Sequence, residues 1–409
     1  MTSILERAEP YYDPYDYEVD ANAHAVWKRL RDEAPLYWND TYGFFALSRF
    51  DDVLPAMLDT NTFSSAHMTV VEMMTPEKTS GGGMMIFMDP PEHTHLRKLV
   101  SRAFTPRAIN GLEGRVRRLC SGYLDQFMGE ESFDFVDDFA ALVPPAVILA
   151  LLGFPEAAAD EWRRGVDSAF HMEQGEDGLV GRRTPEEIQN LTTQSLFGML
   201  PAMLEDRRKE PEDDLISVLV HSDLEELDGS SRKLTDAEIG AFVTLLSIAG
   251  TETVARLLSW AAVLLARNPH ERTILVDDPS VIPNGIEEML RYEAPSPVNA
   301  RWVNRDLEYH GKTLPKDSKL ILLNGSADRD ERHFENADVF DVRRKIDRHT
   351  AFGYGTHFCV GAALARLESR IAIEETLQRF PTWDIDDAEL EWVHTSTVRG
   401  YAKVPIHLR

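Results

Sequence analysis

Apolar residues recur with helical spacing over most of the chain, while short alternating or continuous apolar runs interrupt this pattern in a few places. The clearest helical pattern begins at Thr235, where Glu238 three residues later completes a capping box. It continues to Asn268-Pro269, a strong stop signal. About thirty residues at a rise of about 1.5 Å each give a helix of roughly 45 Å. We expect this helix to cross the whole protein.

The other patterned segments predict a mainly helical chain with a smaller β part. Strands are expected in three β-rich parts, a hairpin at 36–48 and further strands at 300–325 and 383–408. The fold class is therefore mainly α with a minor β part (α+β). No linker is long and polar enough to divide the chain, so residues 1–409 are expected to form one domain. Further helices are predicted over 50–58, 95–127, 142–152, 188–208 and 283–293, with a loop over 170–185.

Composition and charge restrict the possible functions. The 409 residues are 43% hydrophobic and 27% charged, as in ordinary globular proteins. The net charge of −26 disfavours binding to nucleic acid or to an anionic membrane. No run of eighteen apolar residues and no basic-then-apolar start is present, so neither a membrane anchor nor a signal peptide is expected. Two widely spaced cysteines, Cys120 and Cys359, fit the reducing cytoplasm.

One of these cysteines lies in a glycine-rich loop, Phe352-Gly-Tyr-Gly-Thr-His-Phe-Cys359-Val-Gly361, directly before a helical pattern. Unpaired N–H groups and the positive end of the helix dipole favour a thiolate there. A nucleophile would need a base, and His357 is too near in sequence to face it. A zinc site would need more ligands than Cys120 can add. One thiolate without co-ligands suits haem iron, and the alternative is a buried structural cysteine.

The spacing Phe-x-x-Gly-x-His-x-Cys-x-Gly resembles the haem-binding loop of the cytochromes P450. Further motifs extend the resemblance from the hairpin near Leu36 to the C-terminal strands. The resemblance implies a triangular-prism fold of the soluble bacterial type, with the long helix over haem b (iron protoporphyrin IX) and Cys359 as the iron ligand. It implies a monooxygenase that inserts one oxygen atom from O2 into a lipid, terpenoid, steroid or aromatic molecule.

The long helix is interrupted by the segment Ala249-Gly-Thr-Glu252-Thr253. Glycine and threonine are weak helix formers, and a polar pair on an apolar helix is costly to bury without a use. The segment resembles the acid–alcohol pair of the family, which implies that Glu252 and Thr253 deliver protons for cleavage of the O–O bond. The alternative is a helix kink without chemistry.

The resemblance also implies a set of groups that bind the haem. Propionates are carboxylates that need cations or N–H donors. The role of His95, where relatives often carry arginine, stays open. The implied cofactor-binding residues are His93, Arg97, Arg301, Phe352, His357, Cys359 and Gly361.

A second pair of motif residues has a structural rather than a chemical role. Glu288 and Arg291, three apart on one helical face, resemble the Glu-x-x-Arg pair of the family. The resemblance implies that this pair holds the segment before the cysteine loop together with a third, basic residue. Arg344 fits that position better than Arg343.

Six of the thirteen methionines lie within residues 68–88, beside Gly81-Gly82-Gly83. Methionine is apolar and adaptable, so this segment predicts a mobile lid over an apolar pocket. The alternative is irregular core filling. The predicted pocket walls are Met84, Met85, Leu246, Ala249, Val298 and Val398.

Two basic islands, residues 97–118 and 343–348, stand out on this acidic chain. They are either solvated faces or a docking patch for an acidic iron–sulfur ferredoxin, which with its reductase would supply electrons. Charge reversal at Arg102 or Arg344 is then expected to slow electron transfer. The rival functions are a peroxide-driven haem-thiolate enzyme, which the Glu252-Thr253 pair disfavours, and a non-enzymatic haem sensor or carrier.

Overall fold

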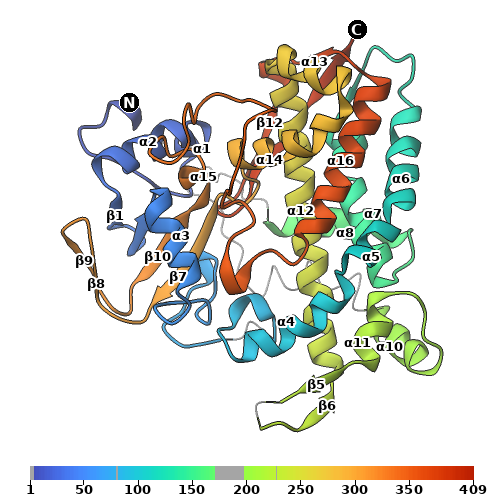
Figure 1. The fold of residues 1–409 in the computed structure, drawn as a ribbon, viewed down its shortest axis with the longest axis horizontal. Helices are drawn as coiled ribbons and strands as arrows, with labels where there is room; N and C mark the ends of the chain where they lie inside the picture. The colour runs from blue at the N-terminus through green and yellow to red at the C-terminus, as the bar shows by residue number, and fades with distance from the viewer. Residues whose placement is uncertain (1–3, 80–81, 171–197, 227) are drawn as a thin grey trace.

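The computed structural model describes residues 4–79, 82–170, 198–226 and 228–409. Figure 1 shows a helical part around the long helix α12 and its neighbour α16, beside a smaller part that contains the main β-sheet. The predicted class, mainly α with a minor β part, is confirmed. The predicted loop over 170–185 falls almost wholly outside the described residues, as does the first half of the helix predicted over 188–208.

About half of the described chain is helical, and the predicted helices are found there, with one of them divided. The pattern over 95–127 divides into three helices, because Thr105 caps a new helix with Pro106 at its first position. The α-helices are α1 (Tyr17–Ala21), α2 (Ala23–Glu33), α3 (Phe50–Leu58), α4 (Glu92–Ala103), α5 (Pro106–Gly111), α6 (Glu113–Asp125), α7 (Val143–Leu152), α8 (Ala158–Phe170), α10 (Leu200–Lys209), α11 (Leu215–His221), α12 (Asp236–Arg267), α13 (Pro269–Asp277), α14 (Ile282–Tyr292), α15 (Asn324–Ala327) and α16 (Ala362–Arg379).

The long helix α12 spans 32 residues and begins with the predicted capping box between Thr235 and Glu238. In the described part of the chain it is also the one helix long and apolar enough to cross a membrane by length and composition. However, 72% of its most apolar window is buried inside the protein, which is typical of a core helix. Helices α7 and α16 pack against it, so α12 forms the centre of the helical part.

The main sheet has five strands in the order β1-β2-β10-β7-β3. The predicted hairpin is present as β1 and β2, and β10 adds to β2 in parallel, although more than 270 residues separate them. The C-terminal region forms the predicted strands. The strands are β1 (Leu36–Asn39), β2 (Phe44–Leu47), β3 (Phe63–Ser64), β4 (Ser132–Asp134), β5 (Asp223–Glu225), β6 (Ser231–Lys233), β7 (Val298–Val303), β8 (Leu307–Tyr309), β9 (Lys312–Leu314), β10 (Lys319–Leu323), β11 (Trp383–Asp384), β12 (Glu391–His394), β13 (Arg399–Lys403) and β14 (Pro405–Leu408).

A buried ion pair joins α14 to the segment that leads to the cysteine loop. Nε of Arg291 lies 2.7 Å from the Glu288 carboxylate, and both side chains are fully buried. Nη1 of Arg291 also donates to the carbonyls of Asp328 and Ala337, each at 2.9 Å. Arg344 is the third member, since its Nε donates to the other oxygen of Glu288 at 3.1 Å. These contacts fasten residues 328–344 to α14.

Candidate functional site

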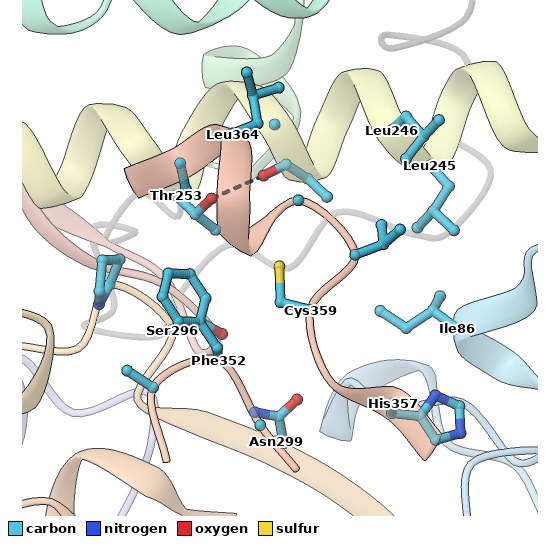
Figure 2. A pocket seen from close by; sticks show the side chains of 18 of the residues that line it. Ile86, Leu245, Leu246, Thr253, Ser296, Asn299, Phe352, His357, Cys359 and Leu364 are labelled. Carbon is cyan, nitrogen blue, oxygen red and sulfur yellow. Dashed lines mark hydrogen bonds between the residues drawn. The ribbon is translucent and has the colours of Figure 1, made fainter. Parts of the chain in front are cut away.

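A cavity of about 280 Å³ lies between α12, the cysteine loop, β7 and α4. Figure 2 shows α12 along one side, with Leu245, Leu246 and Thr253, and Cys359 on the loop that faces it. Seven of the residues predicted from motifs to act in catalysis or to bind a cofactor line this cavity together with Thr253. They are His93, Arg97, Arg301, Phe352, His357, Cys359 and Gly361.

The cysteine loop is shaped by two glycines and a backbone hydrogen bond. Gly353 and Gly355 have φ of 66° and 69°, which side chains other than glycine rarely adopt. The Cys359 N–H donates to the carbonyl of Phe352 at 2.9 Å, and Gly361 caps α16. The loop therefore presents the sulfur at a fixed place before the helix.

The helix terminus does not by itself produce the thiolate that the sequence predicted. Burial raises the pKa of the Cys359 thiol, and the opposing effects of the Gly361 N–H and the Arg97 guanidinium are smaller. A bound metal cation deprotonates a coordinating thiol outright. A thiolate at Cys359 would therefore require a bound metal cation in addition to the loop.

Four basic side chains gather at one end of the cavity, from α4, β7 and the cysteine loop. The His93 and His357 rings are 4.3 Å apart, and His93 Nδ1 and His357 Nε2 are buried with no hydrogen-bond partner in the described chain. Burial lowers the pKa of Arg301 to about 10 and, together with nearby Arg97, that of His93 to about 4. Burial, then Arg301, lowers the pKa of His357 to about 2. The cations of Arg97 and Arg301 beside two unpartnered imidazole nitrogens favour a bound anion here.

Haem fits this donor set. The carboxylates of a haem would supply the acceptors that the basic cluster lacks, and the Cys359 sulfur would bind its iron. Among the described residues no group of three or more His, Cys, Asp or Glu could hold a metal ion, so a macrocycle must provide the remaining ligands of a metal at Cys359. The apolar side chains of Phe352, Val360 and Leu364 offer the walls that a porphyrin ring needs.

The predicted acid–alcohol pair is divided between two environments. Thr253 lines the cavity, and its Oγ1 donates to the Ala249 carbonyl at 2.8 Å, as the dashed line in Figure 2 shows. Glu252 does not line the cavity; it pairs with Arg256 at 2.9 Å. Arg256 in turn donates to the Tyr401 carbonyl at 2.7 Å. The Thr253 hydroxyl therefore faces the cavity, whereas the Glu252 carboxylate lies outside it, paired with Arg256.

Of the predicted pocket walls, Met85, Leu246 and Ala249 line this cavity, and three other residues do not. Side chains alternate along β7, so Arg301 and Asn299 face the cavity while Val298 packs into the core on the other side. Val298 and Val398 instead line a separate space of about 30 Å³ beside the N-terminal segment.

Met84 is the third wrong assignment, since it is half-buried against the core that contains Trp27. Met68 and Met74 are buried in this core, so for them the core-filling alternative applies.

The cavity also has wall residues that the sequence analysis missed. Asn299 could have been found from its spacing of two from Arg301. The missed residues include Thr69, Ile86, Leu245, Ser296, Asn299 and Glu368.

The basic side chains of the two islands differ in exposure: some are paired or line the cavity, and others are exposed. Arg97 lines the cavity, Arg117 pairs with Glu374 and Glu375, and Arg344 is tied to Glu288. The side chain of Arg102 lies outside what the structure describes. The basic side chains of these islands that are exposed are Lys98, Arg107, Arg115, Arg118, Arg343, Lys345 and Arg348.

Comparison with known proteins gives one consistent family. The family model described as Cytochrome P450 matches residues 183–273 and 280–395. Cytochrome P450 123 of Mycobacterium tuberculosis is 38% identical over the full length of both chains. Cytochrome P450 CYP109Q5 from Chondromyces apiculatus superposes with a TM-score of 0.85 at 31% identity, covering 97% of this chain and 98% of the other. CYP109E1 from Bacillus megaterium, solved in complex with testosterone, is 31% identical with a TM-score of 0.82, covering 95% and 98%.

Proposed function

The chain belongs to the cytochrome P450 family of haem b monooxygenases, and from this membership we propose that it hydroxylates a neutral hydrophobic small molecule. The observation that carries the proposal is that Cys359 and Thr253 line the same largely apolar cavity. The overall reaction is R–H + O2 + 2 electrons + 2 H⁺ → R–OH + H2O. The proposed place of action is the cytoplasm.

Each side chain of the site has a proposed task. The bound haem supplies the iron chemistry that activates O2. Cys359 would bind that iron, and the basic cluster of His93, Arg97, Arg301 and His357 would bind the propionates. Thr253 would pass a proton at Oγ1, where its hydroxyl faces the cavity. The apolar walls would exclude water from the reacting carbon.

The charges that line the cavity favour a neutral substrate. Every cation and imidazole among the described lining residues belongs to the basic cluster that the propionates need. No further cation remains in the described lining to bind a substrate carboxylate, and burying an unpaired carboxylate is costly. Ser296 and Asn299 can hydrogen-bond to a hydroxyl or ketone oxygen. The complex of the relative CYP109E1 with testosterone, a neutral steroid, is consistent with this class.

A ligand titration of the haem-loaded ferric enzyme tests the substrate class. We expect neutral steroids or terpenoids to shift the haem from low to high spin. Saturated fatty acids of similar carbon number should bind at least about tenfold more weakly, a difference of about 1.4 kcal/mol. The change in absorption with ligand concentration gives the dissociation constants. Equal or tighter binding of the fatty acids would contradict a neutral substrate.

We propose that an acidic ferredoxin delivers electrons near residues 343–348. A chain of contacts links this segment to the cysteine. His349 lies 3.0 Å from Glu287, and Arg366 binds the same carboxylate at 2.6 Å. The Arg366 charge also acts on the thiol of Cys359. The exposed Arg343 and Lys345 would attract an acidic partner to this side of the site.

Charge reversal tests the docking surface. Lys345→Glu should slow reduction of the haem by a ferredoxin about tenfold at low salt, and the deficit should shrink as salt screens the charges. Stopped-flow reduction at several salt concentrations measures this. Lys312→Glu on the β8–β9 hairpin changes the charge equally and serves as the control. Equal slowing by both variants would refute a local docking surface. Product formation with peroxide but none with O2 and reduced ferredoxin would favour the peroxide-dependent alternative.

A further inference from the structure

Helix α4 carries a polar side chain, His95, that does not line the cavity. His93 and Arg97 on the same helix do line it, and His95 lies two residues from each, about 200° around the helix axis. Nδ1 of His95 lies 2.6 Å from the carbonyl oxygen of Glu225 on β5, 130 residues further along the chain. Because a carbonyl oxygen only accepts, Nδ1 carries the proton of this hydrogen bond. His95 therefore ties the helix of the basic cluster to the β5–β6 hairpin.

The β5–β6 hairpin is also fastened to the start of α12. Arg232 on β6 donates from Nη1 and Nη2 to the two carboxylate oxygens of Glu238, at 2.8 and 2.7 Å. Glu238 is the acid of the capping box, so the same carboxylate accepts from the Thr235 N–H at 2.8 Å. The hydrogen bond from Arg232, with those from Thr235, lowers the pKa of Glu238 to about 2. An anionic Glu238 thus holds both the hairpin and the first turn of α12.

The hairpin connects the two helices through adjacent positions of one short ladder. In its antiparallel register Glu225 pairs with Ser231, and Leu224 pairs with Arg232. Leu224 is 5% exposed in the hydrophobic core that also contains Leu96 of α4, and β5 packs against this helix. Figure 1 shows the hairpin at the N-terminal end of α12, near α4. A displacement of either helix therefore reaches the other through the hairpin.

We propose that His95 is a positioning residue that braces α4, through the β5–β6 hairpin, against the N-terminal end of α12. The brace would hold His93 and Arg97 where the haem propionates require them. Because α12 also carries Thr253 into the cavity, the brace would link two walls of the haem site from outside the cavity. This role needs only the haem b of the family, and not the substrate or the electron donor proposed above.

The rate of haem loss tests the brace without any substrate. Transfer of haem from the ferric enzyme to an excess of apomyoglobin measures this rate. Leucine and asparagine have nearly the same shape, but only asparagine has a donor nitrogen bonded to Cγ, as Nδ1 is in His95. His95→Leu should therefore lose haem about fivefold faster than the wild type, the effect of one hydrogen bond, and His95→Asn less than about twofold faster. Equal rates in the two variants would overturn the proposal.

Glu225→Ala is the matched control on the hairpin. It removes an exposed side chain and keeps the carbonyl that His95 contacts, so haem loss should match the wild type. In the resonance Raman spectrum, the bending bands of the haem propionates should shift in His95→Leu and not in Glu225→Ala. A general loss of stability would not move these bands, so unchanged bands in His95→Leu would overturn the positioning role. If His95→Leu retains no haem, His95→Phe, which keeps an aromatic ring without the donor, replaces it with the same expectations.

A double-variant cycle distinguishes a brace from two independent contacts. Arg232→Ala removes the ion pair of the hairpin with Glu238, outside the cavity, and should speed haem loss by a similar factor. If the hairpin transmits both effects, the double variant with His95→Leu should lose haem no faster than the faster single variant. Increases that multiply in the double variant would show two unrelated contacts and would refute the brace. A wild-type rate in Arg232→Ala would refute it as well.

Discussion

Replacing Arg291 with alanine should lower the free energy of unfolding by about 3–5 kcal/mol. Both members of the ion pair with Glu288 are fully buried, so the variant leaves a carboxylate without its main cation. The carbonyls of Asp328 and Ala337 also lose their donor. Because natural domains are stable by only about 5–15 kcal/mol, this loss is a large share of the total free energy of unfolding. Denaturant unfolding of the haem-loaded enzyme measures it.

Arg343→Ala is the matched control for this variant. Arg343 has an exposed side chain beside the motif, so its removal should change stability by no more than about 0.5 kcal/mol. Arg344→Ala should lie between the two, because Glu288 keeps its bond to Arg291 when the Arg344 bond at 3.1 Å is lost. A change below about 1 kcal/mol in Arg291→Ala would contradict the view that this pair anchors the segment before the cysteine loop.

Local signals predicted the helices well and the sheet only in part. The capping box at Thr235 marked the start of α12 because it is an interaction between residues three apart. The addition of β10 to β2 could not be predicted, since strand pairing across more than 270 residues is decided by tertiary packing. The division of the helical pattern near Thr105 has a local sequence signal, because a capping threonine followed by proline marks the start of a new helix.

In the site, motif positions identified residues but not the directions of their side chains. Successive residues on a helix point about 100° apart, and the face of α12 that lines the cavity includes Thr253 but not Glu252. The motif predicted that Glu252 and Thr253 act together at one site, but in the structure only Thr253 lines the cavity. Glu368 left a signal that was missed, because the buried positions of α16 include Leu364, Leu367 and Ile371, which lie four, one and three residues from it. A carboxyl group on a buried helix face is costly in free energy unless it is paired or has a function.

Thr253→Ala should uncouple oxygen consumption from product formation. The hydroxyl lines the cavity, and its loss removes the group proposed to pass protons. Proton transfer by a positioned group contributes on the order of 10²–10⁴ in rate, so product per electron should fall by at least about tenfold. The electrons should then reduce O2 to hydrogen peroxide instead of supporting product formation. Oxygen, reduced cofactor and product are measured together in one assay, and Thr253→Ser should restore most of the coupling.

Thr251→Ala provides the matched control on the same helix. Thr251 donates to the Ser247 carbonyl at 2.7 Å, just as Thr253 donates to Ala249 at 2.8 Å, so both variants remove the same kind of bond. Thr251, however, is buried away from the cavity and accepts from Trp162 Nε1 at 3.1 Å. Its loss should cost about 1–3 kcal/mol of stability, because a buried donor is left unpaired, with coupling unchanged. Equal uncoupling by both variants would show that helix geometry matters, and not the position of the Thr253 hydroxyl.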